Sequence, residues 1–189
     1  MRDRILDAAT AQFVRRGYDG VSMADIAAEL NITKPALYYH FAGKADLLAE
    51  VFTSYLDELA AVVEASRDIP GSADRLRAIV HGLFDRPAER RAIIRLAMHD
   101  IGRLDEEYRT RFATAYHERF LDRLGDLFAR GAAAGEFVDK DPDLLVRLLL
   151  GILYPLFTPP TAGAAEADSA DVDDLLDVFL CGLVVRPAD

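Results

Sequence analysis

The chain has 189 residues, of which 51% are hydrophobic and 29% are charged, and its 32 acidic and 22 basic side chains give a formal net charge of -10. This composition excludes a disordered or fibrous chain and predicts a globular protein with a substantial core. The longest apolar run, residues 148–157, is shorter than the ~20 residues of a membrane-spanning helix. The charged N-terminal segment lacks the apolar stretch of a secretory signal, so we expect none.

The chain has one cysteine, Cys181, which cannot form an internal disulfide. Because it lies in an apolar stretch, we expect its side chain to be buried in the core. A protein without disulfides suits a reducing compartment, and we expect a cytoplasmic location.

Two helices are predicted in the N-terminal part. In the first, apolar residues recur every four positions up to Phe13, and Gly17 supplies a stop signal. Residues 22–25, Ser-Met-Ala-Asp, have the spacing of a capping box, with Asp in place of the usual Glu. They predict a second, short helix over about 23–30.

A third short helix is predicted over about 34–41. Thr33 can cap this helix, and Pro35 is tolerated because the amide groups of a first turn have no intrahelical partner. Two short helices joined by a tight turn and packed against a third form a helix-turn-helix, whose second helix can enter the DNA major groove.

The third helix has distinct inner and outer faces. At 100° per residue, Leu37 and Phe41 face inward, whereas Pro35, Ala36 and Tyr39 point away. Tyrosine, histidine and lysine side chains gather here, and no Asp or Glu occurs between positions 31 and 45. Phosphates and base edges explain such a surface better than solvation does. Because phosphate attraction is screened over ~10 Å at 0.1 M salt, an acid-free surface can bind DNA while the remainder stays acidic.

Longer helices are predicted after Gly43. They comprise a fourth helix that ends near residues 66–72, a fifth that begins at Ser72, and helices over about 87–99, 104–132, 141–157 and 171–185. A loose loop is expected over 158–170. The sequence shows no strand alternation and no internal repeat, which predicts an all-α protein of about nine helices.

The run from Arg4 to Leu48 carries a specific set of elements in a fixed order. They are Phe13, Gly17-Tyr18, residues 22–27 (SMADIA), residues 30–32 (LNI), residues 37–41 (LYYHF), and Lys44 before Leu47-Leu48. In this order and spacing the chain resembles the tetracycline-repressor (TetR) family of bacterial transcription regulators. The resemblance implies a helix-turn-helix DNA-binding domain over 1–46 and a helical effector-binding and dimerisation domain over 47–189.

The resemblance also implies which residues contact DNA. Ser22 would contact phosphate at the start of the second helix. The contacts at the recognition helix would be those of Thr33, Lys34, Pro35, Ala36, Tyr38 and Tyr39 with bases or nearby backbone, and those of His40 and Lys44 with phosphates. Many family members have Thr or Ser where this chain has Ala36, so only a methyl contact remains there. The operator sequence is therefore not predicted.

Two partners besides DNA follow from the resemblance and the pattern. Helix 141–157 is apolar on almost every side and the last helix is rich in Leu, Val and Phe, which predicts a homodimer through the last two helices. Such a dimer would hold two recognition helices ~34 Å apart and read a palindromic operator. The family also implies a small-molecule effector, here apolar or aromatic, that releases the operator. Its predicted contacts are Phe52, Tyr55, His81, Phe84, Met98, His99, Phe112, Tyr116 and Tyr154.

Other functions remain open at this point. A constitutive repressor without an effector fits the same DNA-binding pattern, and a helical protein-interaction module is a further alternative. An enzyme is not expected, because the sequence lacks a glycine-rich phosphate loop, a GxSxG elbow and a His/Cys cluster with metal-ligand spacing. We accordingly expect no cofactor and no metal, and we expect repression as the regulatory outcome.

Overall fold

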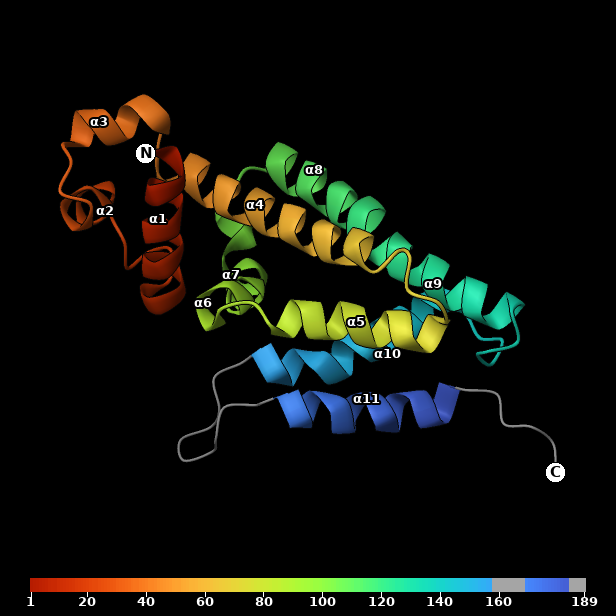
Figure 1. Cartoon of the computed structure of the whole chain (residues 1–189). Coiled ribbons are helices and arrows are strands. Elements are labelled where there is room, and N and C mark those ends of the chain that lie inside the picture. Colours follow the sequence, from red (N-terminus) through yellow and green to blue (C-terminus); the bar gives the residue numbers. More distant parts are fainter. Residues whose placement is uncertain (158–168, 184–189) are drawn as a thin grey trace. The chain divides into compact units, whose positions relative to one another are not determined.

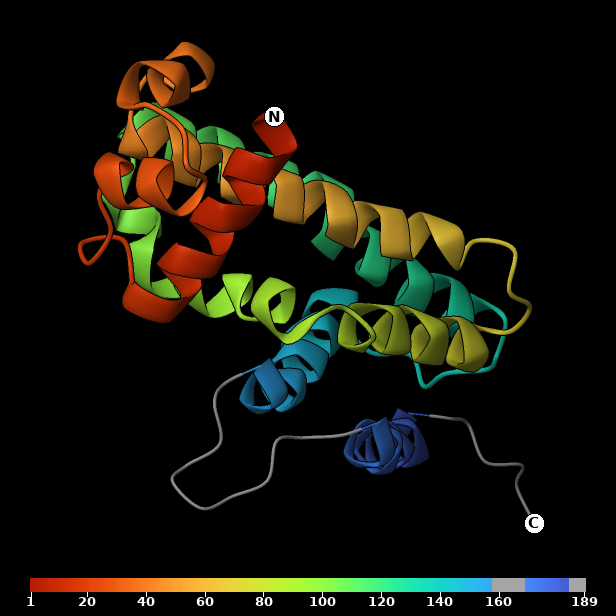
Figure 2. The same ribbon diagram turned by 60° about the vertical axis from the view of Figure 1, so that its left-hand side comes forward.

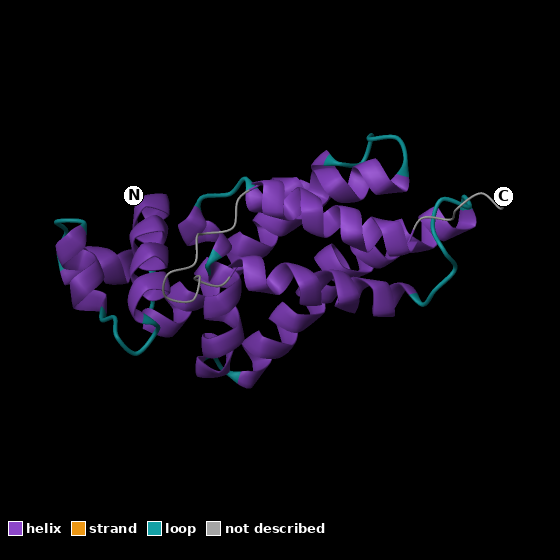
Figure 3. Cartoon of the chain, turned by 90° about the horizontal axis from the view of Figure 1, so that it is seen from below, coloured by secondary structure: helices purple, strands orange, loops and turns teal. Residues whose placement is uncertain are grey.

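A computed structural model of the chain describes residues 1–157 and 169–183, which form helices and no strand (Figures 1 and 3). The helices are α1 (Arg2–Arg16), α2 (Met23–Glu29), α3 (Lys34–His40), α4 (Lys44–Ala65), α5 (Ser72–Phe84), α6 (Ala88–Arg91), α7 (Ile93–Asp100), α8 (Glu106–Tyr116), α9 (Asp122–Ala133), α10 (Pro142–Leu153) and α11 (Ser169–Leu183). The all-α prediction is confirmed. None of these helices is both long and apolar enough to cross a bilayer, within the part of the chain described.

Two of the predicted helices are interrupted, which corrects the prediction. The helix expected over 87–99 divides into α6 and α7 at Ala92, whose backbone N–H bonds to the carbonyls of Ala88 and Arg90. The helix expected over 104–132 consists of α8 and α9, joined by a π-helical turn at His117–Leu121. With each interrupted pair counted once, the described ranges hold the expected nine helices. Periodicity alone does not show where the backbone changes its hydrogen-bond pattern.

The expectation for Cys181 was wrong, because this side chain is exposed. Helix α11 buries the stripe formed by Val172, Leu176, Leu180 and Leu183, and Cys181 lies outside that stripe. The loop expected over 158–170 falls largely outside the described residues, and its last two positions already belong to α11.

The chain divides into two compact units, and the boundary crosses α4 and α8. The first unit comprises Met1–Glu58 and Pro87–Thr114, and the second comprises Leu59–Arg86 and Ala115–Asp189. This division by contacts differs from the functional boundary expected between residues 46 and 47, which stays a prediction.

In the first unit α1 packs against α2, α6 and α7, and α2 packs against α3 (Figure 2). The core beneath α1–α3 contains fully buried side chains from each of these helices and from the start of α4: Ile5, Phe13, Ile26, Leu37 and Leu47. Burying such side chains stabilises the unit by roughly 1.5–3 kcal/mol each. In the second unit α5 packs against α9 and α11, and α9 packs against α10.

Candidate nucleic-acid interface

Helix α3 presents an aromatic face to solvent. Leu37 is fully buried, whereas the exposed fraction of the side chains reaches 50% at Tyr38 and 85% at Tyr39. The edge of the Tyr39 ring meets the ring of His40, with centroids 5.2 Å apart at 83°. Large aromatic side chains exposed to this degree on a short helix are characteristic of a binding surface.

Local chemistry determines where α3 begins and how it is oriented. The hydroxyl of Thr33 accepts a hydrogen bond of 3.3 Å from the backbone N–H of Ala36, and Pro35 occupies the first turn. This cap leaves Lys34, Pro35 and Ala36 exposed, on the same part of the helix as Tyr39. Of the predicted contacts, all those on α3 are therefore exposed except His40, which is half-buried.

Ser22 has a structural role that limits its predicted contact with phosphate. Its hydroxyl donates a hydrogen bond of 2.7 Å to Asp25 Oδ2 and accepts one of 3.2 Å from the Asp25 backbone N–H. The backbone N–H of Ser22 donates a further bond of 2.8 Å to the same carboxylate. Hydrogen bonds from the Ser22 side chain and then from its backbone lower the pKa of Asp25. The capping box is thus confirmed, and a phosphate contact by Ser22 stays a prediction.

Lys44 is engaged inside the protein. Its Nζ atom donates hydrogen bonds of 2.9 Å to the carbonyl oxygens of both Tyr18 and Val21, and it lies 4.0 Å from the centroid of the Tyr18 ring. These contacts use two of the three ammonium hydrogens. Lys44 therefore joins the start of α4 to the loop between α1 and α2, and only its third hydrogen is available for a phosphate.

An open cavity of about 570 Å³ lies beside this surface. Lys34 and Tyr38 of α3 line it together with Lys44 and residues 19–25. Two carboxylates lie in the same cavity, but both are paired. Asp19 forms an ion pair with Arg103, and Asp25 lies 3.8 Å from the guanidinium of Arg16. The cavity is thus lined by the cationic side chains of Lys34 and Lys44 and by two carboxylates that each have an arginine nearby.

A second set of contacts fixes α2 against α1. Gln12, which is buried, donates a hydrogen bond of 2.6 Å to Glu29, and Arg15 lies 3.8 Å from the same carboxylate. Arg16 lies 3.8 Å from Asp25. Sequence reasoning missed these residues, although a glutamine on the apolar side of the first helix was a signal. They position the helix that precedes α3.

Three contacts join α1 and the loop that follows it to residues 90–103, which include the end of α6 and all of α7. Arg90 binds Asp7 at 2.6 Å, and the backbone N–H of Tyr18 donates to Asp100 at 3.4 Å. Arg103 binds Asp19 just beyond α1. A movement of α6 or α7 would therefore act directly on α1.

The nine residues expected to bind an effector belong to both compact units. Phe52, Tyr55, Met98, His99 and Phe112 are in the first unit, and His81, Phe84, Tyr116 and Tyr154 are in the second. Within the first unit the rings of Phe52 and Phe112 lie 5.9 Å apart, but Met98 is 60% exposed. A shared effector site for all nine stays a prediction.

In the second unit three of the predicted residues contact other side chains of that unit. His81 contacts Asp173 of α11 at 2.8 Å, and Phe84 lies 5.7 Å from Phe157. The Tyr116 ring lies 5.7 Å from that of Phe120, and burial raises the pKa of Tyr116 to about 12.

The comparisons with known proteins extend over most of the chain. Residues 5–51 match the family model of bacterial regulatory proteins of the tetR family. Residues 70–157 match the model of a tetracyclin repressor-like C-terminal domain. The two matches follow one another in the order expected for an N-terminal helix-turn-helix and a C-terminal helical domain.

Individual proteins that are similar to this chain are also transcriptional regulators. The HTH-type transcriptional activator FasR of Mycolicibacterium smegmatis is 39% identical over 44% of this chain, but the match spans only 39% of FasR. The HTH-type transcriptional repressor KstR2 of the same organism is 27% identical over 78% of this chain and 73% of KstR2. The crystal structure of AibR in complex with isovaleryl coenzyme A and operator DNA superposes with a TM-score of 0.80 at 25% identity, covering 94% of this chain and 96% of AibR.

Both family models describe tetR-type regulators, and the relatives named above are transcriptional regulators rather than enzymes. The chain belongs to the TetR family of DNA-binding transcriptional regulators.

Proposed function

We propose that this protein is a sequence-specific repressor that binds a palindromic operator as a homodimer and releases it when a small apolar or aromatic effector binds. The observation that carries the proposal is the outward face of α3, where Tyr39 is 85% exposed beside Lys34 and Tyr38. Base edges and phosphates are the partners that match such a combination of aromatic rings, hydroxyls and a cation.

The net negative charge of the chain, -10, is compatible with DNA binding. No acidic residue occurs between positions 31 and 45, and the two acidic side chains of the cavity, Asp19 and Asp25, lie within 4 Å of Arg103 and Arg16, respectively. The remaining negative charge reduces nonspecific attraction to DNA, so binding depends on the contacts of α3 with a matching site.

The dimer proposal is supported by apolar side chains that the second unit leaves exposed. On α10, Leu145, Val146 and Leu149 are buried, whereas Leu144 is 41% and Leu148 is 49% exposed. A pair of exposed leucines at i and i+4 forms a stripe on one side of the helix.

Helix α11 adds a second exposed position of the same kind. Val178 is 76% exposed, and Cys181, one turn further on, is exposed as well. Pairing α10 and α11 with their two-fold copies would cover these residues in a four-helix arrangement. Two recognition helices would then read half-sites ~34 Å apart.

The effector proposal rests on the link between α1 and the α6–α7 segment. Contacts from Arg90, Asp100 and Arg103 join that segment to α1 and its following loop. An effector that displaces α6 or α7 would shift α1 and hence α3. AibR was crystallised with both isovaleryl coenzyme A and operator DNA, which supports an effector with an apolar group.

Mobility-shift titration with the DNA upstream of the protein's own gene tests operator binding. The proposal expects a discrete complex that a matched unrelated fragment does not form. A thermal-shift screen of apolar compounds, followed by operator release, tests the effector. If no compound stabilises the protein and operator binding is intact, the protein is a constitutive repressor.

A further inference from the structure

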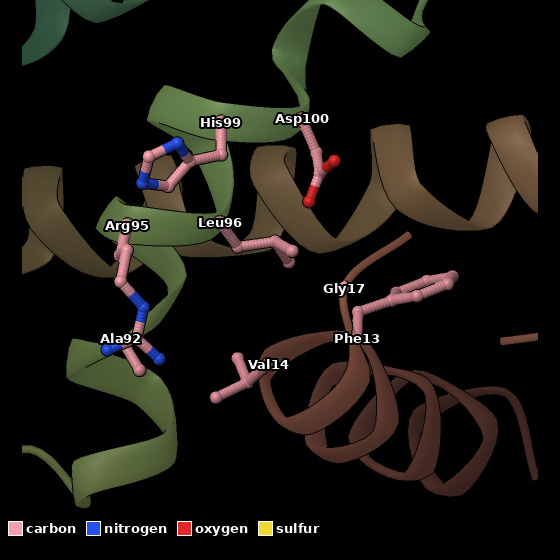
Figure 4. Close-up of a pocket in the computed structure, with 8 residues that line it drawn as sticks. All are labelled: Phe13, Val14, Gly17, Ala92, Arg95, Leu96, His99 and Asp100. Atoms are coloured by element: carbon pink, nitrogen blue, oxygen red, sulfur yellow. The ribbon is translucent and has the colours of Figure 1, made fainter. Parts of the chain in front are cut away.

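A small pocket lies between the C-terminal half of α1 and helix α7 (Figure 4). Its volume is about 210 Å³, below the ~300–1,000 Å³ of sites for drug-sized ligands. Phe13 and Val14 of α1 and Leu96 of α7 provide its apolar lining. The pocket therefore suits a fragment-sized ligand with a compact apolar part.

Two nitrogen-containing side chains, those of Arg95 and His99, lie on the α7 side of this pocket. Arg95 and His99 are four residues apart and thus occupy the same side of the helix (Figure 4). Arg95 is half-buried, yet it forms no hydrogen bond or ion pair with any residue in the described parts of the chain. Both arginines of the neighbouring α6, Arg90 and Arg91, have a partner. A half-buried guanidinium that has no carboxylate partner within the described residues is available to a carboxylate of a ligand.

A third polar residue of the pocket, Asp100, limits the negative charge that a bound anion can carry. The carboxylate of Asp100 accepts a hydrogen bond from the Tyr18 backbone N–H and lies 4.0 Å from Arg103 Nε. Its negative charge is only partly compensated, so it opposes a dianion more strongly than a monoanion. Together with the apolar lining, this favours an organic carboxylate over inorganic phosphate.

We propose that this pocket binds a small organic carboxylate, with the carboxylate held by Arg95 and the apolar part against Val14 and Leu96. The guanidinium fork matches a carboxylate in two parallel hydrogen bonds. The His99 ring lines the same pocket, but the Arg95 guanidinium extends away from it toward Ala92 (Figure 4). Only His99 belongs to the residues expected to bind the effector, so this is a separate site.

The site has a regulatory consequence, which rests on the proposed function. Because one wall belongs to α1 and the other to α7, a bound carboxylate fixes the separation of the two helices. The orientation of α1 determines that of the α2–α3 pair, since Gln12 and Arg15 bind Glu29. Occupancy of the pocket consequently changes operator affinity.

Benzoate and its uncharged counterpart benzamide test the site in the full chain without DNA. Methyl resonances of Val14 and Leu96 report from the pocket, and those of Leu176, buried in α11, serve as the internal control. Benzoate is expected to shift the two pocket resonances saturably and to leave Leu176 unchanged. Benzamide and inorganic phosphate are expected to bind at least about tenfold more weakly.

Three variants separate the contribution of the Arg95 charge from that of the space in the pocket. Arg95→Gln is expected to weaken benzoate binding by about tenfold or more, whereas Arg111→Gln, which removes an exposed arginine paired with Glu107, leaves it unchanged. Val14→Phe fills the pocket and is expected to abolish binding with Arg95 still present. Wild-type affinity in Arg95→Gln, equal binding of benzamide, or tighter binding of phosphate would each overturn the proposal.

A separate measurement of operator affinity at saturating benzoate tests whether occupancy of the pocket changes DNA binding. A change in affinity that Arg95→Gln removes supports it, and unchanged affinity despite saturable methyl shifts rejects it. Failure of the unliganded wild-type protein to bind its operator would instead contradict the proposed function and leave the carboxylate site in place.

Discussion

The ammonium group of Lys44 lies 4.0 Å from the centroid of the Tyr18 ring and donates hydrogen bonds to the carbonyl oxygens of Tyr18 and Val21. Lys44 stands at the start of α4, and the two carbonyls lie in the loop between α1 and α2. A single half-buried side chain thus joins the helix that leaves the helix-turn-helix to the loop that precedes α2. The residue expected to bind phosphate has a positioning role.

Replacing Lys44 is expected to destabilise the fold. Lys44→Met removes two hydrogen bonds from a charged donor and one cation–π contact, and it should lower the free energy of unfolding by about 2 kcal/mol. Denaturant titration at a fixed protein concentration measures this change. Lys34→Met is the matched control, since Lys34 is exposed on α3. It should leave stability unchanged and reduce the salt dependence of operator binding by about one contact. Equal stability of the two variants would contradict the role assigned to Lys44.

The capping box of α2 is expected to depend on pH. Hydrogen bonds from Ser22 lower the pKa of Asp25 below its ordinary value of 3.8. The cap therefore contributes stability above pH 3.8 and loses it as the pH falls through the lowered pKa of the folded state. The melting temperature of Asp25→Ala should lie below that of the wild type at pH 7, and the difference should shrink below pH 3.8. Ser22→Ala should behave in the same way. A difference that is the same at neutral and acidic pH would exclude this origin.

The proposed dimer predicts that charges on the exposed faces of α10 and α11 prevent association. Leu148→Glu and Val178→Glu each place a carboxylate where the two-fold copy would pack, at side chains that are 49% and 76% exposed in one chain. Light scattering should give twice the 20.9 kDa chain mass for the wild type and the single mass for these variants. Met98→Glu changes an apolar residue of the first unit whose exposed fraction, 60%, lies between those two values, and this variant should remain dimeric. A monomeric wild type that still binds its operator would contradict the dimer.

Local sequence chemistry predicted the N-terminal part of the fold well. The ends of α1, α2 and α3 depend on Gly17, on the pair Ser22 and Asp25, and on Thr33, whose effects act within one helical turn. The inward position of Leu37 follows from helical periodicity and is equally local. The family resemblance placed these elements in a helix-turn-helix, and the family models agree.

Features that depend on distant contacts were not predicted. The partners of Lys44 lie 23 and 26 residues before it, and the pocket at Arg95 combines residues about 80 positions apart. Cys181 lies in an apolar stretch, but the burial of each side chain on α11 depends on which face meets α5. Periodicity predicts that a helix has an apolar face, but it does not predict which element packs against that face.

Operator affinity of Tyr39 variants tests the central claim most directly. Tyr39 is 85% exposed, so Tyr39→Ala should leave the melting temperature unchanged. Fluorescence anisotropy with the upstream DNA should show at least about a tenfold loss of affinity for Tyr39→Ala, the equivalent of ~1.4 kcal/mol. Tyr39→Phe separates the contribution of the hydroxyl from that of the ring. If Tyr39→Ala binds the operator as tightly as the wild type does, α3 is not the recognition helix.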